Sequence, residues 1–148
     1  MVINTTRFGE IEIRDDAVLH FPQGLYGMEH LRRFCLLEHE KGGGLFWLQA
    51  MDAPAVAMLV TDPFAYYPNY EVEIPDGAEQ TLEAAAPTDI AVYTTITVAP
   101  DRSGIYTNLL GPLVINLLNR CGMQLIQDSR QYSTRHLIVS PWTATEAA

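Results

Sequence analysis

The chain has few of the residues that build disulfides, metal centres or surfaces for nucleic acids. Only two of its 148 residues are cysteine, Cys35 and Cys121, and they lie far apart without metal-type spacing, which predicts reduced, buried thiols. Lys and Arg number 9 against 18 Asp and Glu, giving a formal net charge of -9. Because such a chain repels phosphate backbones, direct nucleic-acid binding is not expected, and a basic protein partner is favoured.

Long hydrophobic runs are also missing. The alternating stretch after Met1 does not resemble a signal peptide, and no segment has the length needed to span a bilayer. We therefore expect a cytoplasmic protein with no membrane partner. Apolar residues make up 48% and charged residues 18%, the balance of an ordinary globular protein. We expect one domain over residues 1–142, followed by a flexible C-terminal tail at 143–148 whose residues are small and polar.

Motifs for catalysis or cofactor binding are lacking as well. The four histidines show no HxH or HExxH spacing, and Gly42 to Gly44 have neither of the glycine frames that wrap phosphates, so no metal or cofactor is predicted. Ser133 and His136 lie close enough in sequence to suggest a hydrolase. No GxSxG-like glycine environment surrounds that serine, however. We expect Ser133 and Thr134 to satisfy backbone groups at a corner, and Arg135 and His136 to pair with nearby carboxylates.

What the chain does have is a succession of short alternating apolar runs separated by turn signals, which is typical of an all-β domain. Because many short strands without a repeat must hide their edges, we predict a small antiparallel β-barrel-like domain, or a sandwich, with one or two short helices. The predicted strands are Val2 to Thr6, Glu10 to Arg14, Ala17 to Phe21, Cys35 to Glu38, Leu45 to Met51, Ala55 to Thr61, Ile90 to Val98, Leu113 to Leu118 and Met123 to Gln127.

Helices and irregular segments are predicted at only a few places. Apolar residues spaced by three favour a short helix over Gly27 to Phe34, and alanines favour another over Gln80 to Ala86. Three prolines assign the stretch from Phe64 to Glu73 to an edge or a bulged strand. Asn119 and Gly122 suit left-handed or tight-turn positions in the last hairpin.

The stretch after Asp62 is also the main candidate for binding. Aromatic residues beside acidic ones suit capture of a peptide or of a basic protein surface, although the same pattern arises when rings point into the core and acids face water. Two asparagines bracket the apolar run from Leu109 to Ile115, where they either hold turns or bond a partner's backbone. The candidate partner-binding residues are Tyr67, Tyr70, Glu71, Glu73, Asn108 and Asn116.

Eight segments, in order and with matching spacing over nearly the whole chain, resemble the flagellar assembly factor FliW family. They are RFGEIEI from Arg7, HFPQGLYGMEHLRRF from His20, FWLQAMDAP from Phe46, VTDPF from Val60, YPNYEVEIP from Tyr67, ITVAPD from Ile96, TNLLGPLVIN from Thr107 and DSRQYSTRH from Asp128. The chain departs from the family pattern in the turn at 117–122 and in the extension at 137–139.

This resemblance implies a non-enzymatic cytoplasmic regulator with a barrel-like fold. It implies two protein partners, flagellin and the RNA-binding translational regulator CsrA, whose repression of flagellin synthesis the family relieves. On this interpretation Glu71 and Glu73 attract basic groups, Tyr67 and Tyr70 supply contact area, and Asn108 and Asn116 bond the partner's backbone. Two alternatives from other classes are a barrel that binds a small ligand, which needs an internal apolar cavity, and a hydrolase that uses Ser133 and His136.

Overall fold

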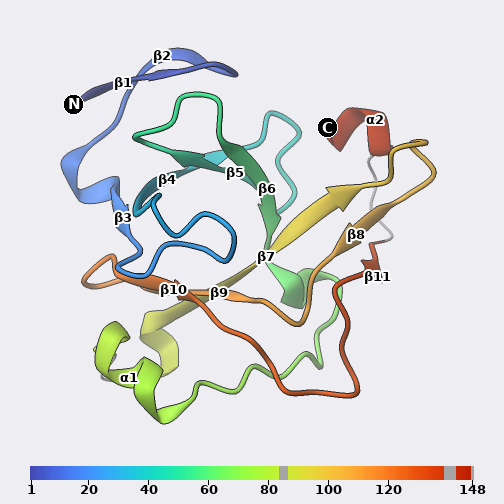
Figure 1. The fold of residues 1–148 in the computed structure, drawn as a ribbon. Helices are drawn as coiled ribbons and strands as arrows, with labels where there is room; N and C mark the ends of the chain where they lie inside the picture. Colours follow the sequence, from blue (N-terminus) through green and yellow to red (C-terminus); the bar gives the residue numbers. More distant parts are fainter. Residues whose placement is uncertain (84–86, 139–142, 148) are drawn as a thin grey trace.

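A computed structural model describes residues 1–83, 87–138 and 143–147 of the chain (Figure 1). Most regular structure in these residues is antiparallel β-sheet. The strands are β1 (Val2–Thr5), β2 (Gly9–Glu12), β3 (Leu19–His20), β4 (Arg33–Glu38), β5 (Leu45–Ala50), β6 (Ala57–Thr61), β7 (Ile90–Val98), β8 (Ile105–Thr107), β9 (Leu113–Asn116), β10 (Gly122–Gln124) and β11 (His136–Leu137). The helical elements are η1 (Asp15–Ala17), η2 (Pro63–Ala65), α1 (Asp76–Leu82), η3 (Pro87–Asp89) and α2 (Ala144–Ala147).

The first two predicted strands form a hairpin. They pair antiparallel with Ile3 opposite Ile11, as a separate two-stranded sheet. Ile3 and Ile13 are buried in a cluster that also contains Cys35 and Met51. The hairpin therefore covers one end of the main sheet with its apolar face, as the alternation of apolar and charged residues requires.

The main sheet is built on a meander, because β4 pairs with β5 and β5 pairs with β6. The long strand β7 is central: its first half pairs with β9, its middle with β6 and its last residues with β8. One parallel bridge, between His20 and Cys121, joins the two ends of the strand path that runs from β10 to β3. The sheet thus curls round to a barrel-like shape without a continuous closing ladder, and the predicted fold class is confirmed.

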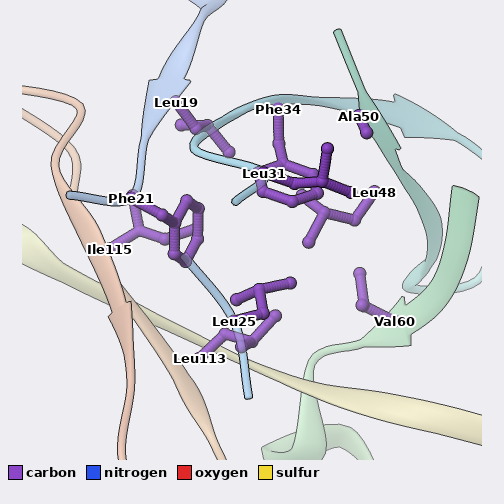
Figure 2. Close-up of a cluster of buried hydrophobic side chains, with 10 residues drawn as sticks. All are labelled: Leu19, Phe21, Leu25, Leu31, Phe34, Leu48, Ala50, Val60, Leu113 and Ile115. Atoms are coloured by element: carbon purple, nitrogen blue, oxygen red, sulfur yellow. The ribbon is translucent and has the colours of Figure 1, made fainter. Parts of the chain in front are cut away.

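The interior of this curled sheet is filled by side chains, as Figure 2 shows for the largest cluster. Phe21 and Phe34 are fully buried and meet edge to face with ring centroids 5.5 Å apart. Burial of each such side chain contributes about 1.5–3 kcal/mol. Gly122 lets β10 approach this cluster, because a Cβ at that position would lie 2.7 Å from Cζ of Phe21.

The predicted left-handed positions in the last hairpin are partly wrong. Arg120 takes the left-handed conformation, with φ of 62°, whereas Gly122 does not. Asn119 instead uses its side-chain oxygen to accept the N–H of Cys121 at 2.9 Å. The glycine is required for the close approach to Phe21 rather than for its backbone freedom.

The helix predicted over Gly27 to Phe34 is not present. Gly27 has φ of +85°, outside the right-handed helical region, and Met28 N–H donates to the carbonyl of Leu25 at 2.8 Å in a tight turn. Phe34 lies in β4 opposite Leu19. The three-residue spacing of apolar side chains therefore reflects a loop that folds back into the core, because burial of Leu31 and Phe34 outweighs helix propensity.

Two further segments differ from prediction. The stretch from Phe64 to Glu73 begins with η2 and contains no strand, so its assignment to an edge or bulged strand is wrong. The helix predicted over Gln80 to Ala86 is found earlier, as α1, which begins after Pro75 and ends at Glu83 in a left-handed conformation. Acidic residues in its first turn stabilise that start. Residues 84–86 of the prediction lie outside the described part of the chain.

Within the segment predicted as a C-terminal tail, Ala144–Ala147 form the short helix α2. Thr143 N–H donates to the carboxylate of Glu146, and Glu146 N–H donates to the hydroxyl of Thr143, both at 3.1 Å. These reciprocal bonds are a capping box. Ala144 and Ala147 are buried in a cluster with Leu45 and neighbouring residues. None of the described helices is both long and apolar enough to cross a membrane.

Candidate protein-binding site

Two segments distant in sequence, 62–73 and 127–137, lie side by side at one border of the sheet (Figure 1). The first leaves the sheet after β6, where the side chain of Asp62 accepts the N–H of Phe64 at 2.9 Å and Pro63 begins η2. Proline at a helix start has no N–H to leave unsatisfied. The sharp turn therefore directs the aromatic residues that follow along the outside of the sheet.

Rings from both segments form one continuous set of contacts, which we call the aromatic seam. Tyr70 meets Tyr132 edge to face with centroids 4.9 Å apart, and Phe64 lies 5.9 Å from Tyr70 on the other side. His136 contacts both Tyr132, at 6.2 Å, and Tyr67, at 5.4 Å. Edge-to-face pairs contribute about 0.5–1.5 kcal/mol each beyond burial, so the seam joins the two segments firmly.

The two predicted tyrosines have different places in the seam. Tyr70 is 5% exposed, and its hydroxyl donates to the carbonyl of Leu109 at 2.6 Å. Burial, together with the neighbouring Tyr132, raises the pKa of the Tyr70 hydroxyl far above its ordinary value. Tyr67 is half-buried, and its hydroxyl donates to the carbonyl of Leu137. Tyr70 is therefore an internal anchor, whereas Tyr67 still presents part of its ring to the surface.

Side chains take the place of a sheet ladder between the two segments. The amide of Gln127 accepts the N–H of Glu73 at 2.8 Å and donates to the Glu73 carbonyl at 2.9 Å, so it bonds like a neighbouring strand. The hydroxyl of Tyr132 accepts the N–H of Glu71 at 3.0 Å. These bonds fix the backbone of both glutamates while their side chains stay exposed.

The exposed acids give this border its charge. Within the described part of the chain, neither Glu71 nor Glu73 forms an ion pair. Two unpaired carboxylates on a fixed backbone, beside exposed Phe64, form a surface with both negative charge and apolar area. Such a surface suits a partner that presents basic groups around an apolar contact.

The two predicted asparagines are not neighbours in the site. Asn108 lies beside it, where its side-chain oxygen accepts the N–H groups of Leu110 at 2.9 Å and Gly111 at 3.0 Å. The turn that it holds includes Leu109, whose carbonyl accepts the bond from Tyr70. Asn108 therefore stabilises the turn to which Tyr70 of the aromatic seam is hydrogen-bonded.

Asn116 is elsewhere, at the end of β9 against α1. It is 2% exposed, its amide donates to the carbonyl of Leu82 at 2.7 Å, and its oxygen accepts the N–H of Leu118 at 2.8 Å. Asn119 donates to the same Leu82 carbonyl at 3.0 Å. Contact between Asn116 and a partner would require these internal bonds to break. The role of Asn116 in the structure is therefore to hold the C-terminal end of α1.

Ser133 and His136 are close together but not arranged as a nucleophile and base. Nε2 of His136 accepts the backbone N–H of Ser133 at 2.8 Å, and the Ser133 hydroxyl accepts the N–H of Arg135 at 3.2 Å. The Ser133 hydroxyl thus satisfies a backbone N–H group at a corner of the chain, as predicted. Arg135 and His136 contact rings rather than the predicted carboxylates: the guanidinium of Arg135 lies 4.0 Å from the ring centroid of Tyr106.

Other chemistry has little support in the described residues. They contain no group of three His, Cys, Asp or Glu side chains placed to hold a metal ion. The small-ligand alternative requires an internal apolar cavity, but side-chain clusters fill the curled sheet. The hollow of about 450 Å³ beside β6 and β7 is a surface groove with a mixed polar and apolar lining.

Sequence reasoning missed two of the residues on which the seam depends, Tyr132 and Gln127. Both lie more than fifty positions from the residues that they contact, Glu71 and Glu73, and no local pattern indicates such pairing. The one feature of the sequence that could have indicated a buried contact is Tyr132, a lone aromatic residue among the charged and polar residues from Asp128 to His136.

Comparison with known proteins decides the family. The model of the family described as FliW protein matches residues 2–138. The chain belongs to the FliW family. The flagellar assembly factor FliW of Moorella thermoacetica is 40% identical over 137 residues, which cover 92% of this chain and 87% of that protein. The FliW of Treponema denticola is 35% identical over 144 residues and covers 97% of both chains.

A solved FliW has the same fold. The crystal structure of a flagellar assembly factor FliW matches with a TM-score of 0.85 and 33% identity, covering 93% of this chain and 96% of that one. The predicted family resemblance is therefore confirmed along almost the whole length. The names of these relatives describe a factor in flagellar assembly.

Proposed function

We propose that the chain acts in the cytoplasm as a flagellar assembly factor that works by stoichiometric contact with other proteins. Its two partners are flagellin and a CsrA-type translational regulator, and binding to the regulator relieves repression of flagellin translation. The observation that carries the proposal is the aromatic seam, with the unpaired carboxylates of Glu71 and Glu73 fixed at its border.

Each predicted residue takes a role that follows from its place. Glu71 and Glu73 are exposed and contact basic groups of the partner, and half-buried Tyr67 adds ring surface beside them. Tyr70 and Asn108 are positioning residues, because their polar atoms bond the loop around Leu109. Asn116 positions α1 against β9 from a buried site.

The charge of the chain supports the choice of a basic, RNA-binding partner. A net charge of -9 repels RNA itself but attracts the positive surface with which a translational regulator binds RNA. Competition or linkage between the two partners turns the concentration of free flagellin into a translation signal through mass action. The protein then turns over no substrate.

Charge reversal at the seam tests the proposal. Glu71→Lys places a cation where the partner's basic groups approach, so affinity for the CsrA-type regulator measured by calorimetry should fall by about 1–3 kcal/mol, or roughly 5- to 150-fold. Glu79→Lys is the matched control, because it makes the same charge change at an exposed position of α1 away from the seam. Equal affinities for the two variants would remove Glu71 from the binding site.

A further inference from the structure

The backbone at the acidic border of the aromatic seam is extended. Over residues 71–74, exposed glutamates alternate with half-buried apolar residues. The two apolar side chains, Val72 and Ile74, pack against the cluster that contains Leu82 of α1. An alternation with a period of two is typical of an extended chain, and a residue that precedes proline, as Ile74 does, is restricted to such a conformation. Figure 1 shows this stretch running toward α1 without a helical turn.

Side chains of the neighbouring segment bond one edge of this stretch. The hydroxyl of Tyr132 accepts the N–H of Glu71 at 3.0 Å. The amide of Gln127 bonds both backbone groups of Glu73, at 2.8 and 2.9 Å. In an extended chain the N–H and C=O groups of residues two apart point to the same side, and those of the residue between them point to the opposite side. The edge that faces Gln127 and Tyr132 is therefore satisfied.

The opposite edge of the stretch is open. Because backbone groups alternate in direction, those of Val72 and Ile74 face away from Gln127. Within the described residues, no backbone or side-chain group forms a hydrogen bond with the N–H or C=O of either residue. Buried backbone groups without a partner are rare in proteins, so these groups face solvent. Like the edge of a sheet, they can pair with an added strand.

Two carboxylates lie on the exposed face of this open edge. Glu71 and Glu73 are exposed, and neither forms an ion pair in the part of the chain that the structure describes. In an antiparallel pair of strands, side chains directly opposite each other share a face, and opposite charges there are stabilising. A strand that pairs with this edge is therefore favoured when it carries basic residues at alternate positions. Its intervening residues lie on the same face as Val72 and Ile74, where apolar side chains are favoured.

The charge of the chain argues against two other occupants of the edge. A second copy of this chain would bring the same two carboxylates to the edge, and like charges directly opposite each other are destabilising. The net charge of -9 on each copy adds to that repulsion. The phosphate backbone of a nucleic acid is repelled for the same reason. A basic segment of a different protein is the occupant that the charges favour.

We infer that the edge at Val72 and Ile74 binds an extended segment of another protein in which basic and apolar residues alternate. Main-chain hydrogen bonds to Val72 and Ile74 supply affinity, and ion pairs with Glu71 and Glu73 supply the preference for basic residues. The bonds on the other edge hold the stretch in this conformation before the partner arrives, which lowers the entropy lost on binding. The inference rests on the proposed function, since it states which kind of segment the acidic border of the seam takes.

Two peptides of the same composition test the recognition of alternation. The probe is a capped peptide with the sequence Lys-Val-Lys-Val-Lys-Val. Its control, Lys-Lys-Lys-Val-Val-Val, has the same charge without the alternation. Calorimetry should give the alternating peptide an affinity at least about tenfold higher. Equal affinities would show that attraction between net charges explains the binding, and this result would overturn the inference, as would an absence of binding by the alternating peptide.

Hydrogen exchange tests the open edge itself. In the free protein the amides of Val72 and Ile74 should exchange faster than those of Glu71 and Glu73, whose N–H groups are bonded. Saturation with the alternating peptide should slow exchange at Val72 and Ile74 by at least about tenfold, because strand addition gives both amides a partner. Exchange at these two amides that the bound peptide leaves unchanged would contradict pairing at this edge.

A matched pair of double variants locates the binding site. Glu71→Gln combined with Glu73→Gln removes the two carboxylates at the edge. Glu10→Gln combined with Glu12→Gln removes two exposed carboxylates with the same spacing from β2, so it makes the same change in net charge away from the seam. The first double variant should reduce the preference for the alternating peptide to less than about threefold, and the second should keep the native preference. The reverse result would place the peptide on β2 and overturn the inference.

The peptide experiments separate this inference from the proposed function, because they use neither flagellin nor a CsrA-type regulator. Binding of those proteins without any preference for the alternating peptide would overturn the inference and leave the proposed function standing. A preference for the alternating peptide without binding of either protein would support the open edge as a binding site and contradict the proposed function.

Discussion

The hydroxyl of Tyr70 donates a 2.6 Å hydrogen bond to the carbonyl of Leu109, although the two residues are 39 positions apart. This bond connects the segment that carries Glu71 and Glu73 to the loop that Asn108 holds. The ring of Tyr70 also contacts Tyr132. Tyr70 therefore determines where the acidic border lies relative to the sheet.

Removal of that hydroxyl should destabilise the protein. Tyr70→Phe keeps the ring but leaves the Leu109 carbonyl without its partner in a buried place, which costs about 1–3 kcal/mol in the free energy of unfolding measured with urea. Tyr26→Phe is the control, because Tyr26 is 62% exposed, and its change should stay within about 0.5 kcal/mol. Equal stability of the two variants would show that the bond to Leu109 contributes nothing.

The same hydroxyl predicts how stability changes in alkali. Burial raises the pKa of Tyr70, so the folded protein holds this proton at a pH at which the unfolded chain, with an ordinary tyrosine pKa of about 10, has released it. Because the unfolded state then binds fewer protons, the contribution of this hydroxyl to the free energy of unfolding should be present in full below about pH 10. It should fall as the pH rises further. Urea unfolding between pH 8 and 11 measures this fall. Tyr70→Phe should show a shallower fall than the native protein, and an identical slope would contradict the assignment.

The close approach of β10 to Phe21 makes Gly122 the more sensitive of two glycines. Gly122→Ala places a Cβ 2.7 Å from the Phe21 ring and should lower the free energy of unfolding by about 1–3 kcal/mol. Gly77→Ala, inside α1 with no atom within 4 Å of the added Cβ, should be neutral or stabilise by up to about 1 kcal/mol. Thermal or urea unfolding measures the stability of both variants. If Gly122→Ala is as stable as Gly77→Ala, the Phe21 ring can shift to make room for the added Cβ at no cost.

The capping box predicts a difference between two threonines of the same short helix. Thr143→Ala removes the hydroxyl that accepts the N–H of Glu146 and should cost about 0.5–2 kcal/mol. Thr145→Ala changes an exposed residue of α2 and should have little effect on stability. Hydrogen exchange of the Glu146 and Ala147 amides provides the local measurement. Similar exchange in both variants would mean that the box does not hold α2.

Strands with strong local patterns were predictable from sequence. The run of β-branched residues from Ile90 to Val98 predicts β7 with its observed bounds, and the alternation in Glu10 to Arg14 predicts the first hairpin. These signals are local, because strand propensity and alternation arise from residues within one element. The meander from β4 to β6 followed from the short turns between its strands.

Failures occurred where distant contacts override local preference. Leu31 and Phe34 have helical spacing, yet Gly27 in a left-handed conformation and the pairing of Phe34 with Leu19 place them in a loop and a strand. Thr143 and Glu146 also form a TxxE capping signature, in a segment whose small and polar composition predicts a tail. For the site, the acidic and aromatic residues were evident, but their partners Tyr132 and Gln127 were not, because those contacts are made only by the folded sheet.

The central claim is that this chain acts by binding other polypeptides in fixed ratio. Calorimetric titration of the unmodified protein with purified flagellin, and separately with a purified CsrA-type regulator, measures this most directly. The account predicts saturable binding of each partner at a defined stoichiometry. An absence of binding to both partners under conditions in which all three proteins are folded would contradict it.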